Sequence, residues 1–302
     1  MQDLGLLLDV DGPIASPVSR TIRIGSILDD LVTLTASGVP IAFVTGRSDT
    51  FMREKVVTQL LDAGLAEALE VPGARMFGVF EKGAAWAPIT SGGLGRVRVD
   101  RTVALPRVVV DEVRELVASR FSDTMFFDET KRAMISVEQR TDVSSAAYSE
   151  AQSRFVGAAF ALVAGHGLGV RLRDRQSPDA AGNVPFRLDP TIISTDIESV
   201  LLDKDRGAER ALEYFATLGP LPTTWRSVGD SRSDYLMADH LYQAGFAVAH
   251  VDVRPADGIL ERPYRVITEG DAIHDEAGAK FLSYWVEQTR ASTSSATAVH
   301  VP

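Results

Sequence analysis

The sequence contains no cysteine and only five histidines among its 302 residues. The lack of cysteine excludes a disulfide framework, a thiolate metal site and a thiol nucleophile. Long apolar runs are missing too. The most membrane-like stretch, residues 155–170, is shorter than the roughly 20 residues that span a bilayer, and it contains His166. The first residues lack the basic and apolar regions of a signal peptide. We therefore expect a cytoplasmic protein with no membrane partner.

Positive charge is in short supply, because 31 lysines and arginines face 41 acidic residues. The net charge of −10 and the pI near 5.0 argue against nucleic acid or an anionic membrane as a partner. An anionic small molecule is still possible, since a bound metal can reverse the charge inside one cleft. The length is enough for one large domain or two modest ones.

Apolar strands and amphipathic helices alternate in two parts of the chain. Residues 41–44 and 76–80 are predicted strands separated by a helix, and the alternation returns after residue 200 with a strand at 224–228. Such alternation predicts an α/β fold with a Rossmann-like parallel sheet. We assign residues 1–84 and 200–290 to this core.

Residues 85–199 have a different pattern, because their predicted strands occur in adjacent pairs. Helices are expected near 108–120 and 146–164, and a turn is expected at Asp189-Pro190. This pattern predicts a separate α+β module inserted into the core. Arg171, Arg173 and Arg175 alternate on one extended stretch, where they fit either a substrate-binding face or a solvated strand face. Residues 291–302 are predicted to be a disordered tail.

Two aspartates end the first predicted strand, in the stretch LGLLLDVDGPIASP at residues 4–17. Strand alternation places Asp9 and Asp11 on the same side, at the edge where ligands of open α/β sheets bind. Two crowded carboxylates repel each other unless a cation or a shared proton lies between them. The pair alone would also fit an ordinary acidic turn.

Two further polar segments follow or precede core elements. Thr45, Gly46 and Arg47 come directly after the strand at 41–44 and offer a hydroxyl and backbone N–H groups at a helix start, which suits an anion. Lys204 precedes the helix expected at 206–216. Its ammonium could fold back toward Asp9 and neutralise a phosphate oxygen.

The last polar segment again places acidic residues just after a predicted strand. Asp230 and Asp234 follow the strand at 224–228, and Asp234 could also cap the next helix. With carboxylates as donors and no cysteine, Mg²⁺ fits this set better than zinc.

These segments together resemble the four motifs of the haloacid dehalogenase superfamily of phosphohydrolases. The matching residues are Asp9-Val-Asp11-Gly12, Thr45-Gly46-Arg47, Lys204 and Gly229-Asp230-x-x-x-Asp234. The inserted module resembles the large α+β cap of the sugar-phosphatase branch, which includes the Cof-like hydrolases and the sucrose- and trehalose-phosphate phosphatases. The segment at 81–84 is similar to the Glu-Asn-Gly-Ala that often leads into such a cap.

The resemblance implies a role for each matching residue. Asp9 would attack phosphorus and form an aspartyl-phosphate, and Asp11 would protonate the leaving alcohol and then activate water. Thr45, with the adjacent Gly46 and Arg47, would hold the phosphoryl group, and Lys204 would balance its charge.

The resemblance also implies a magnesium site. Asp9, Asp230 and Asp11, through its backbone carbonyl, would bind Mg²⁺, while Asp234 would order this metal site. The sequence departs from the family at Pro13, where threonine or serine is common. It departs again around Lys204, where Arg206 directly precedes the glycine and competes for the role of phosphate-binding cation.

The function implied is an Mg²⁺-dependent phosphatase for a small phosphomonoester, namely a sugar phosphate, with the cap setting specificity. A phosphomutase or phosphotransferase would use the same nucleophile, and a non-catalytic phosphometabolite-binding protein could keep the same cleft. The sequence names neither the leaving group nor the oligomeric state.

Overall fold

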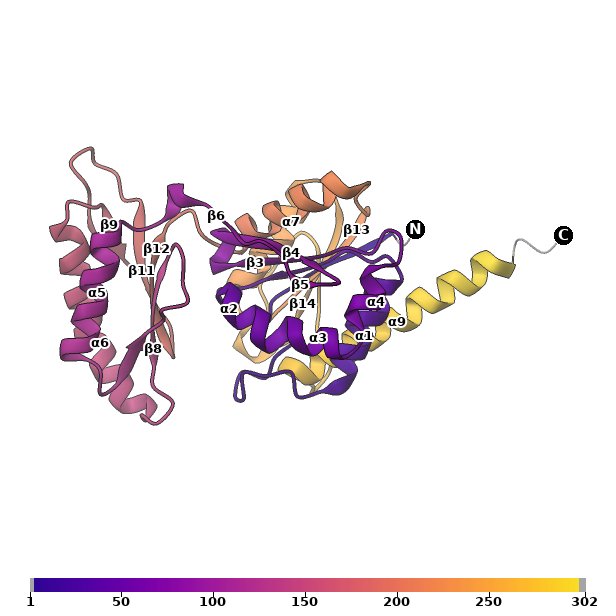
Figure 1. Cartoon of the computed structure of the whole chain (residues 1–302), viewed down its shortest axis with the longest axis horizontal. Helices are drawn as coiled ribbons and strands as arrows, with labels where there is room; N and C mark the ends of the chain where they lie inside the picture. Colours follow the sequence, from indigo (N-terminus) through magenta and orange to yellow (C-terminus); the bar gives the residue numbers. More distant parts are fainter. Residues whose placement is uncertain (1–2, 299–302) are drawn as a thin grey trace. The chain divides into compact units, whose positions relative to one another are not determined.

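A computed structural model describes residues 3–298 and divides the chain into two compact units (Figure 1). The core unit comprises Met1–Arg98 and Asp203–Pro302, and the inserted unit comprises Val99–Leu202. The core unit is built on a mostly parallel sheet, and the inserted unit has a separate sheet of mainly antiparallel pairs. The predicted α/β fold with an inserted α+β module is therefore confirmed.

Strand β1 (Leu4–Leu8) lies inside the core sheet, whose order is β15-β14-β13-β1-β2-β3-β4-β5. The pairs from β15 to β3 are all parallel. Four of the five β1 residues are fully buried, as expected for a strand covered on both faces. The other strands of this sheet are β2 (Ile41–Val44), β3 (Met76–Phe80), β4 (Ala85–Thr90), β5 (Gly93–Leu94), β6 (Arg98–Val99), β13 (Thr224–Gly229), β14 (Ala247–Asp252) and β15 (Arg265–Ile267).

Helices cover both faces of the core sheet. Those of the core unit are α1 (Gly25–Ala36), α2 (Asp49–Met52), α3 (Thr58–Asp62), α4 (Leu65–Leu69), α7 (Lys204–Leu218), α8 (Tyr235–Gln243) and α9 (His274–Ala298). Side chains of α7 and α8 pack with Phe77 and Trp225 in one apolar cluster. Helices α1 and α9 pack together on the opposite face (Figure 1). Within the described residues, no helix is both long and apolar enough to cross a bilayer.

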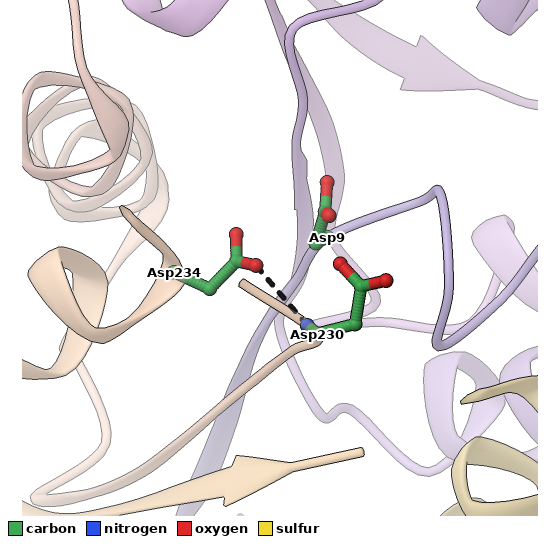
Figure 2. A group of neighbouring side chains, drawn as sticks. All are labelled: Asp9, Asp230 and Asp234. Carbon is green, nitrogen blue, oxygen red and sulfur yellow. Dashed lines mark hydrogen bonds between the residues drawn. The ribbon is translucent and has the colours of Figure 1, made fainter. Parts of the chain in front are cut away.

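Parallel pairing brings the carboxyl ends of the central strands to one edge of the sheet. The loops that follow β1 and β13 begin at this edge, and they carry Asp9, Asp230 and Asp234 (Figure 2). The fold therefore gathers acids that lie more than 200 residues apart in the chain.

Two expected boundaries of the core need correction. The core sheet continues past residue 84, because β4 pairs antiparallel with β3 from Phe80↔Ala85 onward, and the division between the units falls at Arg98. Disorder was expected from residue 291, but α9 runs to Ala298, since no glycine or proline interrupts residues 279–298. Residues 299–302 of the expected tail lie outside the described part of the chain.

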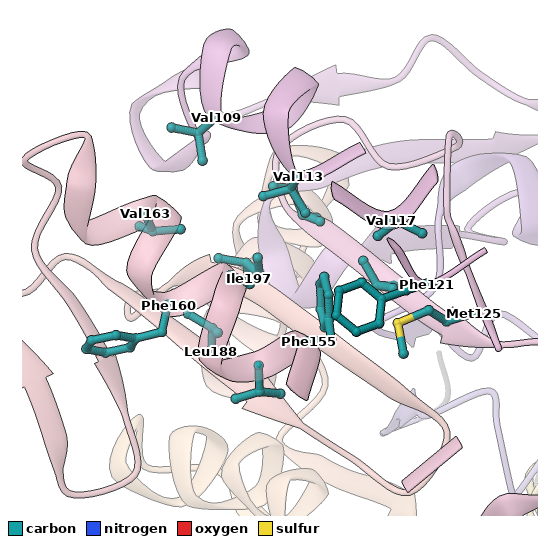
Figure 3. Packing of buried hydrophobic residues seen from close by; sticks show 14 of the residues in the cluster. Val109, Val113, Val117, Phe121, Met125, Phe155, Phe160, Val163, Leu188 and Ile197 are labelled. Atoms are coloured by element: carbon teal, nitrogen blue, oxygen red, sulfur yellow. The ribbon is translucent and has the colours of Figure 1, made fainter. Parts of the chain in front are cut away.

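The inserted unit packs two helices on one face of its sheet. Its elements are α5 (Arg107–Arg120), β7 (Met125–Phe127), β8 (Ile135–Gln139), α6 (Ser145–Gly165), β9 (Val170–Leu172), β10 (Arg175–Ser177), β11 (Phe186–Pro190) and β12 (Ser194–Ser199), in the sheet order β10-β9-β11-β12-β8-β7. Val113, Phe155 and Ile197 are fully buried between the helices and the sheet (Figure 3). The inserted unit therefore has an apolar core of its own.

Two expectations for the inserted unit were wrong. Arg171 and Arg175 do not share a face, because the chain reverses at Arg173, whose φ is 51°, and Arg175 instead stacks on the Phe160 ring at 4.1 Å. The turn expected at Asp189-Pro190 lies later, since Pro190 ends β11 and pairs with Thr195.

Candidate active site

The loop after β1 holds Asp9 at the carboxyl edge of the core sheet. The Asp9 N–H donates to the Val228 carbonyl at 2.9 Å, which extends the pairing of β1 with β13. The chain then turns at Gly12, which has a φ of +102°. A Cβ added there would lie 2.6 Å from Asp230 Cγ. Only glycine allows this close approach, so Gly12 lets the two acidic loops meet.

Lys204 connects three parts of the site from the first turn of α7. Its Nζ donates to the Val44 carbonyl at 2.8 Å, and it contacts Asp9 Oδ1 at 2.6 Å and Asp234 Oδ1 at 2.7 Å. Burial lowers the pKa of Lys204, but the charges of Asp234 and Asp9 outweigh burial and leave that pKa above its usual range. Lys204 is therefore a buried, charged group that contacts one backbone carbonyl and two carboxylates.

Asp234 has its second oxygen fixed by the turn that follows β13. Oδ2 accepts a hydrogen bond from the N–H of Asp230 at 3.1 Å (Figure 2). It also accepts from the N–H and hydroxyl of Ser231 at 2.9 and 2.7 Å. Burial would raise the pKa of Asp234, but Lys204 and these donors hold it below its usual value. Asp234 therefore orders this turn as an ionised carboxylate.

The negative charges of Asp9 and Asp230 are less well balanced by nearby cations and hydrogen-bond donors than that of Asp234. One carboxylate oxygen from each of the three acids lies within 4.8 Å of the others. Burial raises the pKa of Asp9 well above its usual value, and the charge of Asp234 raises it further. Burial and then Asp234 raise the pKa of Asp230 to about 6. Negative charge at this edge therefore exceeds what Lys204 neutralises.

The residues that follow β2 make a second contact with the β1 loop. Arg47 Nε and Nη2 donate to the two carboxylate oxygens of Asp11 at 2.8 and 2.9 Å. The Arg47 N–H donates to the hydroxyl of buried Thr45 at 3.1 Å, and the guanidinium lies 4.7 Å from the centre of the Phe51 ring. The predicted phosphate-binding arginine is thus paired with the predicted general acid.

Comparison with solved structures identifies the fold. The C-terminal domain of trehalose-6-phosphate phosphatase from C. albicans superposes with a TM-score of 0.63 at 10% identity, covering 94% of this chain and 92% of that one. A haloacid dehalogenase-like hydrolase from Bacteroides thetaiotaomicron superposes with a TM-score of 0.57 at 11% identity, covering 93% and 98%. This chain has the haloacid dehalogenase fold. The motif resemblance is therefore confirmed at the level of the fold.

A third solved structure with this fold belongs to a nucleotidase. The IMP-nucleotidase of Plasmodium falciparum superposes with a TM-score of 0.50 at 12% identity, covering 83% of this chain and 59% of that one. No protein-family model matches the sequence, and no curated protein matches it either. The similarity to these proteins therefore lies in the fold and not in the sequence.

All eight residues predicted for the site lie in the core unit of this haloacid dehalogenase fold, in or next to the loops described above. They are Asp9, Asp11, Thr45, Gly46, Arg47, Lys204, Asp230 and Asp234. Lys204, rather than Arg206, reaches the acids. The Arg206 side chain lies beside Gly83, where an added Cβ would come within 2.9 Å of Arg206 Cγ. Their chemical roles stay predictions.

Two basic residues near Asp230 were missed in the sequence. Arg254 Nη1 lies 4.0 Å and His274 Nδ1 lies 3.4 Å from Asp230 Oδ2. Arg254 also contacts Asp257, and its charge partly offsets the raised pKa of Asp230. The sequence could have indicated Arg254, because it lies just after β14 and every other part of the site also follows a core strand or starts a helix. Nothing in the sequence marks His274.

The donors at this edge suit a hard cation. Asp9, Asp230 and Asp234 each offer one carboxylate oxygen to such an ion, but Asp234 also contacts Lys204 and the turn donors, so the charges of Asp9 and Asp230 are the less compensated pair. The raised pKa values of these two acids show that a positive charge between them would be stabilising. Oxygen ligands of this kind match Mg²⁺.

Proposed function

We propose that this protein is an Mg²⁺-dependent phosphatase that hydrolyses a small phosphomonoester, namely a sugar phosphate, through an aspartyl-phosphate on Asp9. The observation that carries the proposal is the contact of the buried Lys204 with Asp9 and Asp234, beside the Asp11–Arg47 pair. A binding protein needs neither a buried nucleophile nor a second acid next to it. The fold supports the same chemistry, since its solved relatives include a trehalose-6-phosphate phosphatase.

In the first step an oxygen of Asp9 attacks phosphorus, and the bond from phosphorus to the ester oxygen breaks. Asp11, two residues further along the chain, gives a proton to the departing alkoxide. Lys204 and the N–H groups around Thr45 hold the phosphoryl oxygens, whose charge is spread over three atoms in the transition state. A bound Mg²⁺ would add charge neutralisation between the acids and the phosphate.

In the second step Asp11 takes a proton from water, and the water oxygen attacks phosphorus. The bond from phosphorus to Asp9 breaks, so inorganic phosphate leaves and the Asp9 carboxylate is restored. Arg47 holds both oxygens of Asp11 in the resting enzyme. An incoming phosphate offers the guanidinium an alternative bidentate partner, which would release the Asp11 carboxylate to take up a proton from solvent and then act as an acid.

We further propose that the inserted unit supplies substrate recognition. On the face of its sheet away from α5 and α6, Arg187 donates to Glu198 at 3.0 and 2.8 Å, and Ser136 donates to Asp196 at 2.7 Å. Carboxylates and guanidinium groups on one face can bind the hydroxyl groups of a polyol. An Asp196→Asn variant should raise KM for the preferred sugar phosphate and leave KM for p-nitrophenyl phosphate unchanged.

The test is phosphate release from a panel of esters in Mg²⁺ and in chelator. The panel contains trehalose-6-phosphate, glucose-6-phosphate, IMP and p-nitrophenyl phosphate. The wild type is compared with Asp9→Asn and with Asp62→Asn, which removes an exposed carboxylate of α3. We expect metal-dependent release that is lost in Asp9→Asn and kept in Asp62→Asn.

Two results would contradict the proposal. Turnover that survives in Asp9→Asn would exclude this residue as the nucleophile. Transfer of the phosphoryl group to a second sugar, without release of phosphate, would show a phosphotransferase or mutase instead.

A further inference from the structure

A cavity of about 720 Å³ lies in the core unit between α9 and the core sheet. Its walls include Leu4 at the start of β1, Arg226 of β13, Arg265 of β15 and one face of α9, formed by Lys280, Phe281, Tyr284, Trp285 and Gln288. Ligand-binding pockets have volumes of roughly 300–1,000 Å³, so this cavity has the size of a small-molecule site. Nothing in the proposed phosphatase mechanism uses it.

The cavity is separate from the candidate active site. Arg226 pairs with Leu6 of β1, and Asp9 comes three residues after Leu6, or roughly 10 Å further along the strand. Arg226 also lies on the sheet face opposite Trp225, which packs with α7 and α8. A ligand in this cavity would therefore bind near α9 without contacting Asp9.

Two arginines face this cavity from neighbouring positions of the sheet. Arg226 and Arg265 both pair with Ala249 of β14, so they lie level on one face and two strands apart, roughly 10 Å between Cα atoms. Burial lowers the pKa of Arg226, Arg265 lowers it further, and Tyr284 acts in the opposite direction. Both guanidinium groups stay charged, since arginine is not deprotonated in proteins.

Neither arginine has an acidic partner among the side chains that the structure describes. Arg226 donates to the Trp225 carbonyl at 2.8 Å. The two carboxylates of the cavity wall have other contacts, because Asp3 accepts from the Thr223 N–H at 2.6 Å and Glu269 lies 3.7 Å from Lys280. Half-buried Arg226 and exposed Arg265 on the edge strand therefore both line this cavity without a carboxylate contact of their own in the described part of the chain.

Aromatic side chains of α9 form another wall of the cavity. Phe281 and Trp285 are nearly buried and their ring centres lie 5.9 Å apart, while Tyr284 is half exposed. Flat apolar surfaces beside a few fixed charges are typical of sites for organic ligands. We propose that this cavity binds an organic anion in which a planar ring carries a phosphate, sulfonate or carboxylate group.

The full-length protein can be tested with 8-anilinonaphthalene-1-sulfonate, whose fluorescence rises on binding. We expect saturable binding to the wild type that weakens about tenfold in Arg226→Gln and in Arg265→Gln, because each change removes one charge-assisted contact with the sulfonate. Arg96→Gln is the matched control, since it removes an exposed guanidinium elsewhere in the core unit. Trp285→Phe should abolish the energy transfer from Trp285 to the probe. Near-ultraviolet circular dichroism verifies that each variant is folded.

Several results would overturn the proposal. One is no saturable binding to the wild type, and another is equal affinity in folded Arg226→Gln, Arg265→Gln and Arg96→Gln. A third is equal affinity for N-phenyl-1-naphthylamine, which has the rings without the sulfonate. Loss of binding in Lys204→Met, with none in the arginine variants, would place the probe at the catalytic edge instead. The assay contains no phosphate ester, so its outcome does not depend on phosphatase activity.

Discussion

Helix α9 touches the nucleophile loop at Gly278, and this contact gives a quantitative test of how the site is positioned. A Cβ added to Gly278 would lie 1.9 Å from the Pro13 carbonyl oxygen and 2.9 Å from its carbon. A Cβ and a carbonyl oxygen in ordinary contact lie about 3.5 Å apart. In Gly278→Ala the backbone of α9 and the loop at Pro13 would therefore have to separate by roughly 1.5 Å. Pro13 comes two residues after Asp11, so the separation would be transmitted to the predicted general acid.

The expected effect on activity is larger than the effect on stability. Overpacking costs about 1–3 kcal/mol, and the better helix propensity of alanine returns about 1 kcal/mol, which leaves a net loss of about 0–2 kcal/mol. A displacement of about 1 Å at a catalytic group can lower the rate about 100-fold. Gly278→Ala should therefore unfold at slightly lower urea concentration and lose most of its turnover.

The assays are urea unfolding and kcat on the preferred ester, with Gly157→Ala as the control. Gly157 lies exposed in α6, where an added Cβ would meet no atom within 4 Å. This control should gain about 0.5–1 kcal/mol and keep its turnover, because it changes only helix propensity. If Gly278→Ala matched the control in both assays, the position of the nucleophile loop would not depend on this contact.

Three further predictions concern ionisable side chains. Lys204→Met leaves two buried carboxylates unpaired and should cost about 3–5 kcal/mol in urea unfolding at pH 7; a loss below about 1 kcal/mol would contradict this. If Arg47 acts through Asp11, the double variant Arg47→Met/Asp11→Asn should turn over as slowly as Asp11→Asn alone, whereas multiplied losses would indicate a separate role. Burial lowers the pKa of His250 to about 4, so between pH 6.5 and 4 only the unfolded state takes up this proton and the wild type loses stability as the pH falls. His250→Gln should therefore gain about 2 kcal/mol relative to the wild type between pH 7 and pH 5, and parallel pH profiles would disprove this.

The sequence predicted the site residues better than it predicted their partners. Asp9, Lys204 and Asp230 each follow an apolar strand or start a helix, so parallel pairing alone brings them to one edge. The contacts of Arg47 with Asp11 and of Arg254 with Asp230 depend on side-chain directions in irregular loops, for which no periodic pattern exists.

Prediction of the fold from the sequence was also less accurate for the less regular elements. Strand β3 was predicted to the residue, because a run of apolar residues is decisive in a buried parallel strand. The β4–β5 hairpin was assigned to the inserted module, since short antiparallel strands look alike whichever sheet they join. The extension of α9 past residue 290 was missed because a polar Ser/Thr segment resembles a tail.

The position of β1 has a consequence for synthesis on the ribosome. One edge of β1 pairs with β2, which follows within 45 residues, while its other edge pairs with β13, where Leu4 meets Thr224. At 5–20 residues per second, roughly 10–40 s separate the appearance of these two partners. The inserted unit, with an apolar core of its own, is complete within this interval. A nascent chain from which residues up to about 210 have emerged should therefore hold a finished inserted unit and an apolar strand with one unpaired edge, the kind of surface that aggregates or recruits chaperones.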